Sequence, residues 1–120
     1  MHAAASSSPD ATQPRRLPRN PDGIEMIFLT VLLTARDAAD VPRVRELLAE
    51  AMRKSRTEPG CVRFDVYHSS AEPRRFTLVE HWASQEALDA HRLAEAYTHI
   101  YKPHVMPLVD REGHPGTLLD

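Results

Sequence analysis

The sequence predicts an α+β fold of the ferredoxin-like type: a split β-α-β arrangement with an antiparallel sheet and both helices on one face. Three observations predict it. Apolar residues alternate with polar ones in some segments and recur at helical spacing in others. These segments follow one another in the order β-α-β-β-α-β. The chain has 120 residues, which suits a single domain.

The chain divides into three parts. Residues 1–25 form a leader rich in Ala, Ser and Pro, whose prolines disfavour regular structure, so we expect it to be disordered. The leader has no apolar stretch of the kind that a secretory signal needs. Residues 26–110 form the folded domain. Residues 111–120, which include two glycines and Pro115, are expected to form a tail.

The first strand is predicted over residues 26–34, which read MIFLTVLLT. Both of its sides are largely apolar, so both should be covered. A helix follows from Asp40, an N-cap candidate, to the vicinity of Arg56, with Pro42 in its first turn. Its apolar residues share one side at helical spacing, and the Pro59-Gly60 pair breaks the chain after it.

Two alternating segments, residues 62–69 and 76–82, predict an antiparallel hairpin with its loop at residues 70–74. Ser84 is the expected N-cap of a helix that carries His91. A further helical stretch covers residues 94–102, and we expect Pro103 to end it. Residues 105–109 contain Pro107 and are expected to form an edge strand or irregular structure.

Helices on one face would leave the other face of the sheet bare. Because the first strand is apolar on both sides, we expect a second layer on that face. In so small a chain, the sheet of a second copy is the simplest source of that layer. The sequence therefore predicts a homodimer.

Composition and charge argue against several other partners. The net charge is −2, with acids and bases mixed along the chain, so no basic stripe suggests nucleic acid. No segment approaches the roughly 20 apolar residues of a membrane-spanning helix. Cys61 is the only cysteine, and we expect a small buried residue at a strand start, with a catalytic thiolate as the alternative. We expect a cytoplasmic protein.

The segment from Glu58 to His91 carries a characteristic series of short motifs. In order and spacing, this series resembles the antibiotic biosynthesis monooxygenase (ABM) family, and the resemblance covers most of residues 26–109. The motifs are Pro59-Gly60, Arg63-Phe64-Asp65-Val66-Tyr67, the turn from Pro73 to Phe76, Glu80-His81-Trp82, Glu86-Ala87-Leu88 and His91.

The resemblance implies a dimeric α+β barrel built from ferredoxin-like subunits. It also implies a choice of activities, since the family includes quinol and polyketide monooxygenases that use no flavin or metal, heme-degrading monooxygenases and an isomerase-like enzyme. Members often place a second histidine shortly after the one that matches His91. Here that position is Ala96, and the next histidine is His99, so no role of a second histidine is transferred.

Three residues are the candidates for catalysis. His91 could act as a base, because an imidazole accepts a proton near neutral pH and helical spacing with Leu88 turns it toward the sheet. A hydrogen-bonded core histidine is the alternative. Trp82 could stack on a flat substrate or pack in the core. Glu80 is a carboxylate within an apolar strand pattern, so it needs a partner or a raised pKa, and it could orient a neighbouring residue.

Five residues are candidates for contact with a substrate. Tyr67 and Tyr97 could donate hydrogen bonds to a substrate oxygen, or pack as half-buried tyrosines. Phe64 and Met52 could line the pocket or fill it, and His99 is the fifth candidate. The histidines at 91, 99 and 104 do not share one helix face, so no metal site is expected. We expect no cofactor, since phosphate-binding loops and dinucleotide fingerprints are missing from the sequence.

The leading hypothesis is a cofactor-independent monooxygenase that oxidises a quinol-like or polycyclic phenolic small molecule with dioxygen. A deprotonated hydroquinone is electron-rich enough to reduce dioxygen, so the protein has to bind the ring, favour the anion and exclude water. The alternatives are an isomerase or lyase acting on a small oxygenated metabolite, phosphorylated or not, a heme-binding or heme-degrading protein, and a non-catalytic dimeric binding module.

Overall fold

The computed structural model describes residues 18–19 and 23–119. Its antiparallel sheet has four strands in the order β2-β3-β1-β4. The strands are β1 (Ile27–Ala35), β2 (Cys61–His68), β3 (Arg75–Trp82) and β4 (Val109–Gly116), and the helices are α1 (Val41–Ser55), α2 (Gln85–His91) and η2 (Ala96–Val105). Short turns η1 (Ala38–Asp40) and η3 (Met106–Leu108) flank α1 and β4. This order and pairing confirm the predicted ferredoxin-like α+β fold.

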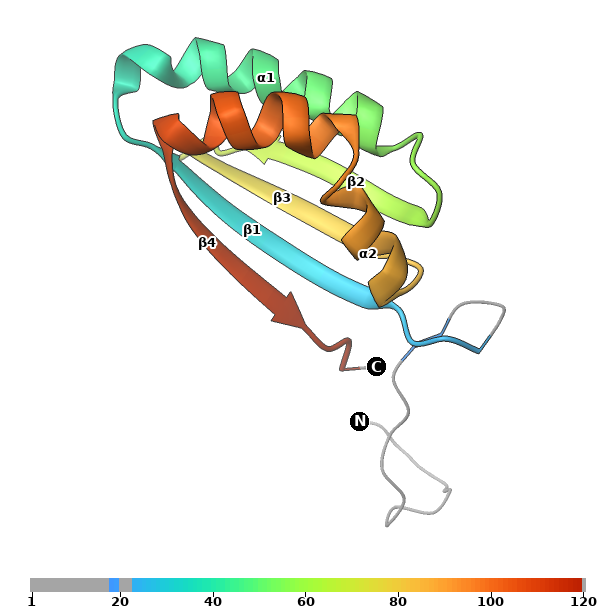
Figure 1. Cartoon of the computed structure of the whole chain (residues 1–120). Helices are drawn as coiled ribbons and strands as arrows, with labels where there is room; N and C mark the ends of the chain where they lie inside the picture. Colours follow the sequence, from blue (N-terminus) through green and yellow to red (C-terminus); the bar gives the residue numbers. More distant parts are fainter. Residues whose placement is uncertain (1–17, 20–22, 120) are drawn as a thin grey trace.

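The helices all lie on one face of the sheet, where α1 and η2 run side by side and α2 covers one end (Figure 1). Alternate residues of β1, from Leu29 to Leu33, point into this layer and are buried. They pack with Phe76 and Leu78 of β3 and with the apolar side of α1. Burial of each such side chain contributes about 1.5–3 kcal/mol, so this layer stabilises the fold.

None of the described helices or strands covers the opposite, outer face of the sheet (Figure 1). Phe28, Thr30 and Leu32 of β1 point to it and are only partly buried. Phe28 packs edge-on against His81 of β3, with the ring centroids 4.7 Å apart. The apolar side chains of the outer face therefore stay partly open to solvent within one chain.

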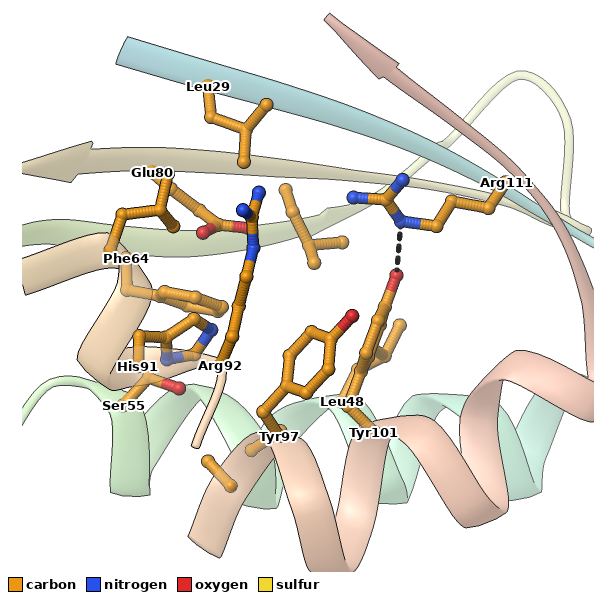
Figure 2. A pocket seen from close by; sticks show the side chains of 14 residues that line it. Leu29, Leu48, Ser55, Phe64, Glu80, His91, Arg92, Tyr97, Tyr101 and Arg111 are labelled. Atoms are coloured by element: carbon orange, nitrogen blue, oxygen red, sulfur yellow. Dashed lines mark hydrogen bonds between the residues drawn. The ribbon is translucent and has the colours of Figure 1, made fainter. Parts of the chain in front are cut away.

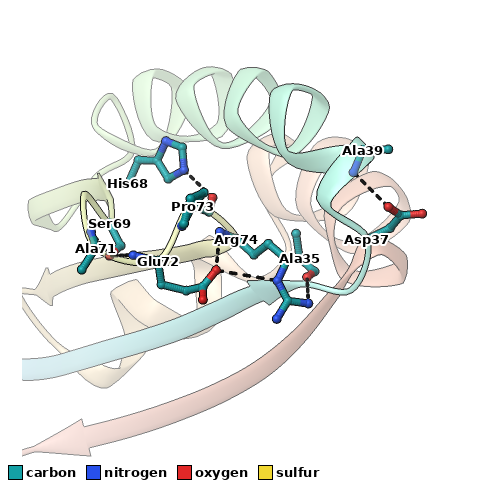
Figure 3. A network of polar contacts seen from close by, with 9 residues as sticks. All are labelled: Ala35, Asp37, Ala39, His68, Ser69, Ala71, Glu72, Pro73 and Arg74. Atoms are coloured by element: carbon teal, nitrogen blue, oxygen red, sulfur yellow. Dashed lines mark hydrogen bonds and ion pairs between the residues drawn. The ribbon is translucent and has the colours of Figure 1, made fainter.

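The start of α1 differs from the prediction in its cap. Asp40 makes no hydrogen bond that caps the helix. Asp37 instead accepts a hydrogen bond from the backbone N–H of Ala39, at 2.9 Å, and so caps the short turn η1 that leads into α1 (Figure 3). Because η1 precedes α1, the residue whose side chain makes the capping bond is Asp37 and not the predicted Asp40.

The predicted hairpin between β2 and β3 is confirmed. Its loop is held by its own side chains, as Figure 3 shows: the hydroxyl of Ser69 accepts from the N–H groups of Ala71 and Glu72, and the carboxylate of Glu72 accepts from the N–H of Arg74. These bonds satisfy backbone donors that the sheet leaves unpaired. Ser84 caps α2 as predicted, accepting from the N–H of Ala87.

The predictions for the last third of the chain are wrong in two places. Pro103 does not end the helical stretch but lies inside η2, a π-helix that continues to Val105. The N–H of Met106 donates to the carbonyl of Tyr101, five residues earlier, which is the wider π pattern. A proline that lacks one N–H removes a single bond of this pattern and leaves the rest in place.

The final strand is displaced from its predicted position. Residues 105–108 continue the helical path through η3, and the edge strand β4 begins only at Val109. It extends to Gly116, pairing with β1 over its whole length, so most of the predicted tail at residues 111–120 belongs to the sheet. Pro115 is tolerated because β4 is an edge strand.

The predicted leader, residues 1–25, falls mostly outside the described residues. In its described part, Arg19 and Glu25 form an isolated antiparallel bridge, and the N–H of Met26 donates to the carbonyl of Pro18. Among the described residues, no helix is long and apolar enough to span a bilayer.

Candidate active site

A pocket lies between the inner face of the sheet and the helices (Figure 2). It has a volume of about 440 Å³, which includes space open to solvent. Its lining combines apolar side chains with a small polar set, as ligand sites do. The lining residues are Leu29, Leu48, Ala51, Ser55, Phe64, Leu78, Glu80, Leu88, His91, Arg92, Ala96, Tyr97, Tyr101 and Arg111.

His91 is held at the pocket by a carboxylate. Its Nδ1 lies 2.7 Å from Oε1 of Glu58, and both side chains are largely buried. A carboxylate only accepts hydrogen bonds, so the proton of the neutral ring sits on Nδ1 and Nε2 keeps its lone pair. Among the described residues the ring makes no second hydrogen bond. In the neutral ring, Nε2 of His91 is therefore free of a proton beside the pocket.

The turn before β2 fixes Glu58 in this position. The N–H of Glu58 donates to the carbonyl of Ser55, and its own carbonyl accepts from the N–H of Cys61. Gly60 closes the turn with a φ of +82°, a conformation that favours glycine. The missing side chain of Gly60 also lets α2 approach, since a Cβ there would lie 2.5 Å from that of Ala87. Ala87 precedes His91 by about one helical turn, so this contact sets the position of the imidazole.

Gly60→Ala is therefore expected to lower the free energy of unfolding by on the order of 2–4 kcal/mol, from backbone strain plus the clash with Ala87. Gly23→Ala is the matched control, because Gly23 has a φ of +79° but open space around it, and it should cost at most about 1 kcal/mol. Urea titrations of both variants measure the difference. Equal midpoints for the two would show that Gly60 does not hold α2.

Glu80 and Trp82 form a second buried pair. Nε1 of Trp82 donates to Oε1 of Glu80 at 3.0 Å. Trp82 is 0% exposed and Glu80 is 5% exposed. Burial raises the pKa of Glu80, against the opposing effects of this hydrogen bond and of the charges on His91, Arg111 and Arg92. From the sequence, Glu80 was expected to have either a partner or a raised pKa. In the structure it has both.

The raised pKa of Glu80 predicts a pH dependence of stability. Between the ordinary carboxyl pKa of 4.5 and the raised value, the folded state holds a proton that the unfolded state has lost. A rise in pH through this window therefore lowers the free energy of unfolding. Glu80→Gln should flatten this part of the curve, and the exposed Glu46→Gln should leave it unchanged. Urea unfolding at several pH values tests this, and identical slopes for wild type and Glu80→Gln would contradict it.

The indole of Trp82 lies in the core rather than at the pocket. Its ring packs against His91, with centroids 4.5 Å apart, and edge-on against Phe64 at 6.3 Å. It is fully buried and is not among the lining residues. Of the two roles considered for Trp82, the structure places it in core packing, where it supports the imidazole from behind.

The structure brings some of the other candidates to the pocket and not the rest. Phe64 and Tyr97 line it, and Tyr97 packs edge-on against His91. Tyr67 does not, because alternation along β2 turns it to the outer face, where it is 51% exposed and accepts from Arg63. Met52 packs against the core from the side of α1 without lining the pocket. His99 is exposed on η2 and lies beside Thr98.

Sequence reasoning missed five residues of the site. Glu58 was seen only as the start of a motif, and nothing local in the sequence links it to a histidine 33 positions away. Arg111 was assigned to a tail. Arg92, Tyr101 and Ser55 reach the pocket only because η2, α1 and the loop after α2 meet there. The hydroxyl of Ser55 is buried and, within the described part of the chain, has no hydrogen-bond partner.

Cys61 begins β2 and is partly buried. Burial, reinforced by the neighbouring Glu58 and Glu80, raises the pKa of its thiol to about 11. The thiolate is therefore scarce at neutral pH, which argues against the alternative of a catalytic cysteine. Over residues 18–19 and 23–119, no group of three His, Cys, Asp or Glu side chains is arranged to hold a metal ion.

Fold and site together define a small ferredoxin-like α+β protein with a histidine-bearing pocket between its sheet and its helices. The family model for antibiotic biosynthesis monooxygenase matches residues 26–103. The chain belongs to this family, as the motifs between Glu58 and His91 indicate. Among curated proteins, none matches the chain.

Several solved structures are similar to this chain. A Bacteroides thetaiotaomicron protein of unknown function, described as a possible oxidoreductase, has 24% identity and a TM-score of 0.71, over 78% of this chain and 97% of that one. Rv0793 from Mycobacterium tuberculosis has 27% identity and a TM-score of 0.65, over 80% and 95%. A protein named antibiotic biosynthesis monooxygenase has 23% identity and a TM-score of 0.64, over 76% and 95%. These likenesses support the fold.

Proposed function

We propose that the protein is a cofactor-independent monooxygenase that oxidises a quinol-like or polycyclic phenolic small molecule with dioxygen. The observation that supports it most is the Glu58–His91 pair, which in the neutral ring keeps the proton on Nδ1 and leaves Nε2 of a buried imidazole as a base beside an aromatic-lined pocket. A base in this state can take a phenolic proton at neutral pH.

The reaction needs no electron donor other than the substrate. Nε2 of His91 takes the phenolic proton, and the resulting phenolate passes one electron to dioxygen, which gives a substrate radical and superoxide. These combine through a C–O bond to a hydroperoxide. Loss of water then leaves a hydroxyquinone, so one oxygen atom enters the product and the other leaves in water. The quinol supplies all four electrons, and the proton on His91 returns to the departing water.

The pocket offers aromatic side chains beside a few polar groups, as binding of a phenolic ring requires. A ring that enters it meets the exposed side chain of Arg92. The unpartnered hydroxyl of Ser55 could then donate to an oxygen of the substrate.

Oxygen uptake with a panel of hydroquinones and naphthols tests the proposal. With isotopically labelled dioxygen, we expect one labelled atom in the product and one in water. Hydrogen peroxide in place of labelled product would indicate a simple oxidase. No uptake above the autoxidation of the substrates, over a broad panel, would contradict the proposal.

A second candidate is an isomerase or lyase that uses the same base without oxygen. The two arginines at the pocket favour it, because they suit an anionic metabolite such as a phosphorylated one. The two functions are separated by the need for dioxygen: turnover that persists under anaerobic conditions would support the second.

We also propose that the protein is a homodimer in which the outer faces of two sheets meet. The partly buried Phe28, Thr30 and Leu32, together with Val79 of β3, offer an apolar surface for this contact. Light scattering should give twice the mass of one chain, and Val79→Asp should lower it to that of one chain. A wild-type mass equal to one chain would contradict the dimer. Location in the cytoplasm stays a prediction from the sequence.

A further inference from the structure

Two arginines converge on the pocket from different elements. Arg92 follows the end of α2, and Arg111 comes from β4. Figure 2 shows both guanidinium groups directed into the space beneath the sheet, toward which the hydroxyls of Tyr97 and Tyr101 also point. Among the described residues, neither arginine forms an ion pair, and the one side-chain partner of Arg111 is the hydroxyl of Tyr101, which accepts from its Nε at 3.0 Å.

The acidic groups near the pocket do not balance these charges. Of the carboxyl groups in the described part of the chain, only that of Glu80 lines it, and burial raises the pKa of Glu80, which reduces its negative charge. Glu58 is already paired with His91. The lining therefore carries an excess of positive charge, supplied by two exposed arginines beside apolar side chains, and this charge favours an anionic ligand.

Arg111 and the base lie at opposite ends of one row of side chains. The ring of His91 lies 5.7 Å from that of Tyr97, which lies 5.3 Å from that of Tyr101, whose hydroxyl contacts Arg111. A flat molecule placed along this row would have one edge near Nε2 of His91 and the other near the guanidinium of Arg111. Burial raises the pKa of Tyr101, so its hydroxyl keeps a proton that it can donate to a ligand oxygen.

We propose that the pocket selects an aromatic substrate that carries a carboxylate, with Arg92 and Arg111 as the carboxylate subsite. This deepens the proposed function, on which it rests for the proton transfer at His91, although binding of the acid requires no turnover. A planar carboxylate suits the planar fork of a guanidinium.

Calorimetric titration in the absence of oxygen tests the subsite with matched ligands. The probes are 2,5-dihydroxybenzoate and its neutral isostere 2,5-dihydroxybenzamide, each titrated into the full chain. We expect the acid to bind roughly tenfold more tightly or better, about 1.4 kcal/mol, and added salt to reduce the preference. Arg92→Gln and Arg111→Gln should each reduce the preference while binding of the amide stays unchanged, and the exposed Arg45→Gln should have no effect.

Circular dichroism shows whether Arg111→Gln keeps its fold, and Arg92→Gln, at an exposed side chain, carries the test if it does not. Equal affinities of the acid and the amide in the wild type would overturn the proposal, as would a preference that both arginine variants retain. Tighter, arginine-dependent binding of phenyl phosphate than of benzoate would overturn the assignment of a carboxylate. A preference for the acid in a protein that consumes no oxygen would refute the monooxygenase and leave the subsite standing.

Discussion

Replacing His91 by alanine is expected to lower the turnover of a quinol by about 10²–10⁴-fold, the usual contribution of a positioned general base. The effect follows from the unprotonated Nε2 that His91 presents beside the pocket. Because the loss occurs in proton transfer, kcat should fall more than KM rises. Initial rates of oxygen uptake, corrected for autoxidation, measure it.

Two variants separate chemistry from folding. Glu58→Gln keeps the size of the side chain, but its amide can also donate to the ring, so the proton of His91 is no longer held on Nδ1. We expect turnover to fall by about 10–100-fold. His104→Ala, an exposed histidine on η2, should keep wild-type activity. Turnover by His91→Ala equal to that of His104→Ala would remove His91 from the mechanism.

Replacing Trp82 by alanine is expected to lower the free energy of unfolding by about 3–5 kcal/mol, since a large aromatic side chain is removed from a buried site. The indole fills the space behind His91 and beside Phe64, and its loss leaves a cavity. The carboxyl of Glu80 also loses the donor that it has within the core. Circular dichroism during urea unfolding measures the change, as the chain has no other tryptophan to follow by fluorescence.

A double-mutant cycle separates packing from hydrogen bonding. Trp82→Phe keeps much of the volume but removes the N–H that donates to Glu80. It should lower the free energy of unfolding by about 1–3 kcal/mol, because a buried carboxyl is left without its donor. In the background of Glu80→Leu, which removes the acceptor, the same change should lower the free energy of unfolding by less, because the hydrogen bond is already absent. Strictly additive costs would show that the bond from Trp82 to Glu80 contributes nothing.

Periodicity was sufficient for the parts of the fold in which one side of each element is buried. The alternation in β2 and β3 and the helical spacing in α1 follow directly from burial on one face. It failed at η2 and β4. A π-helix accommodates Pro103 where an α-helix would end, and β4 is a polar edge strand that buries only Val109, so its sequence has no apolar alternation to detect.

The same limit explains which parts of the site could be predicted. Glu80, His91 and Phe64 were found because each lies on the inner face of an element with a clear period. Tyr67 was misplaced, although alternation with Phe64 turns it outward. Glu58 and Arg111 come from a turn and from an edge strand, and only the tertiary packing of α2 and η2 brings them to the pocket.

The protonation of the His91 ring tests the account most directly. Long-range proton–nitrogen NMR spectra at neutral pH distinguish a ring nitrogen that carries hydrogen from one that does not, and His91→Ala identifies the signals. We expect the proton of the neutral ring on Nδ1 and a bare Nε2, with a mixture of the two forms in Glu58→Gln. A neutral ring that carries its proton on Nε2 would contradict the assignment of His91 as the base.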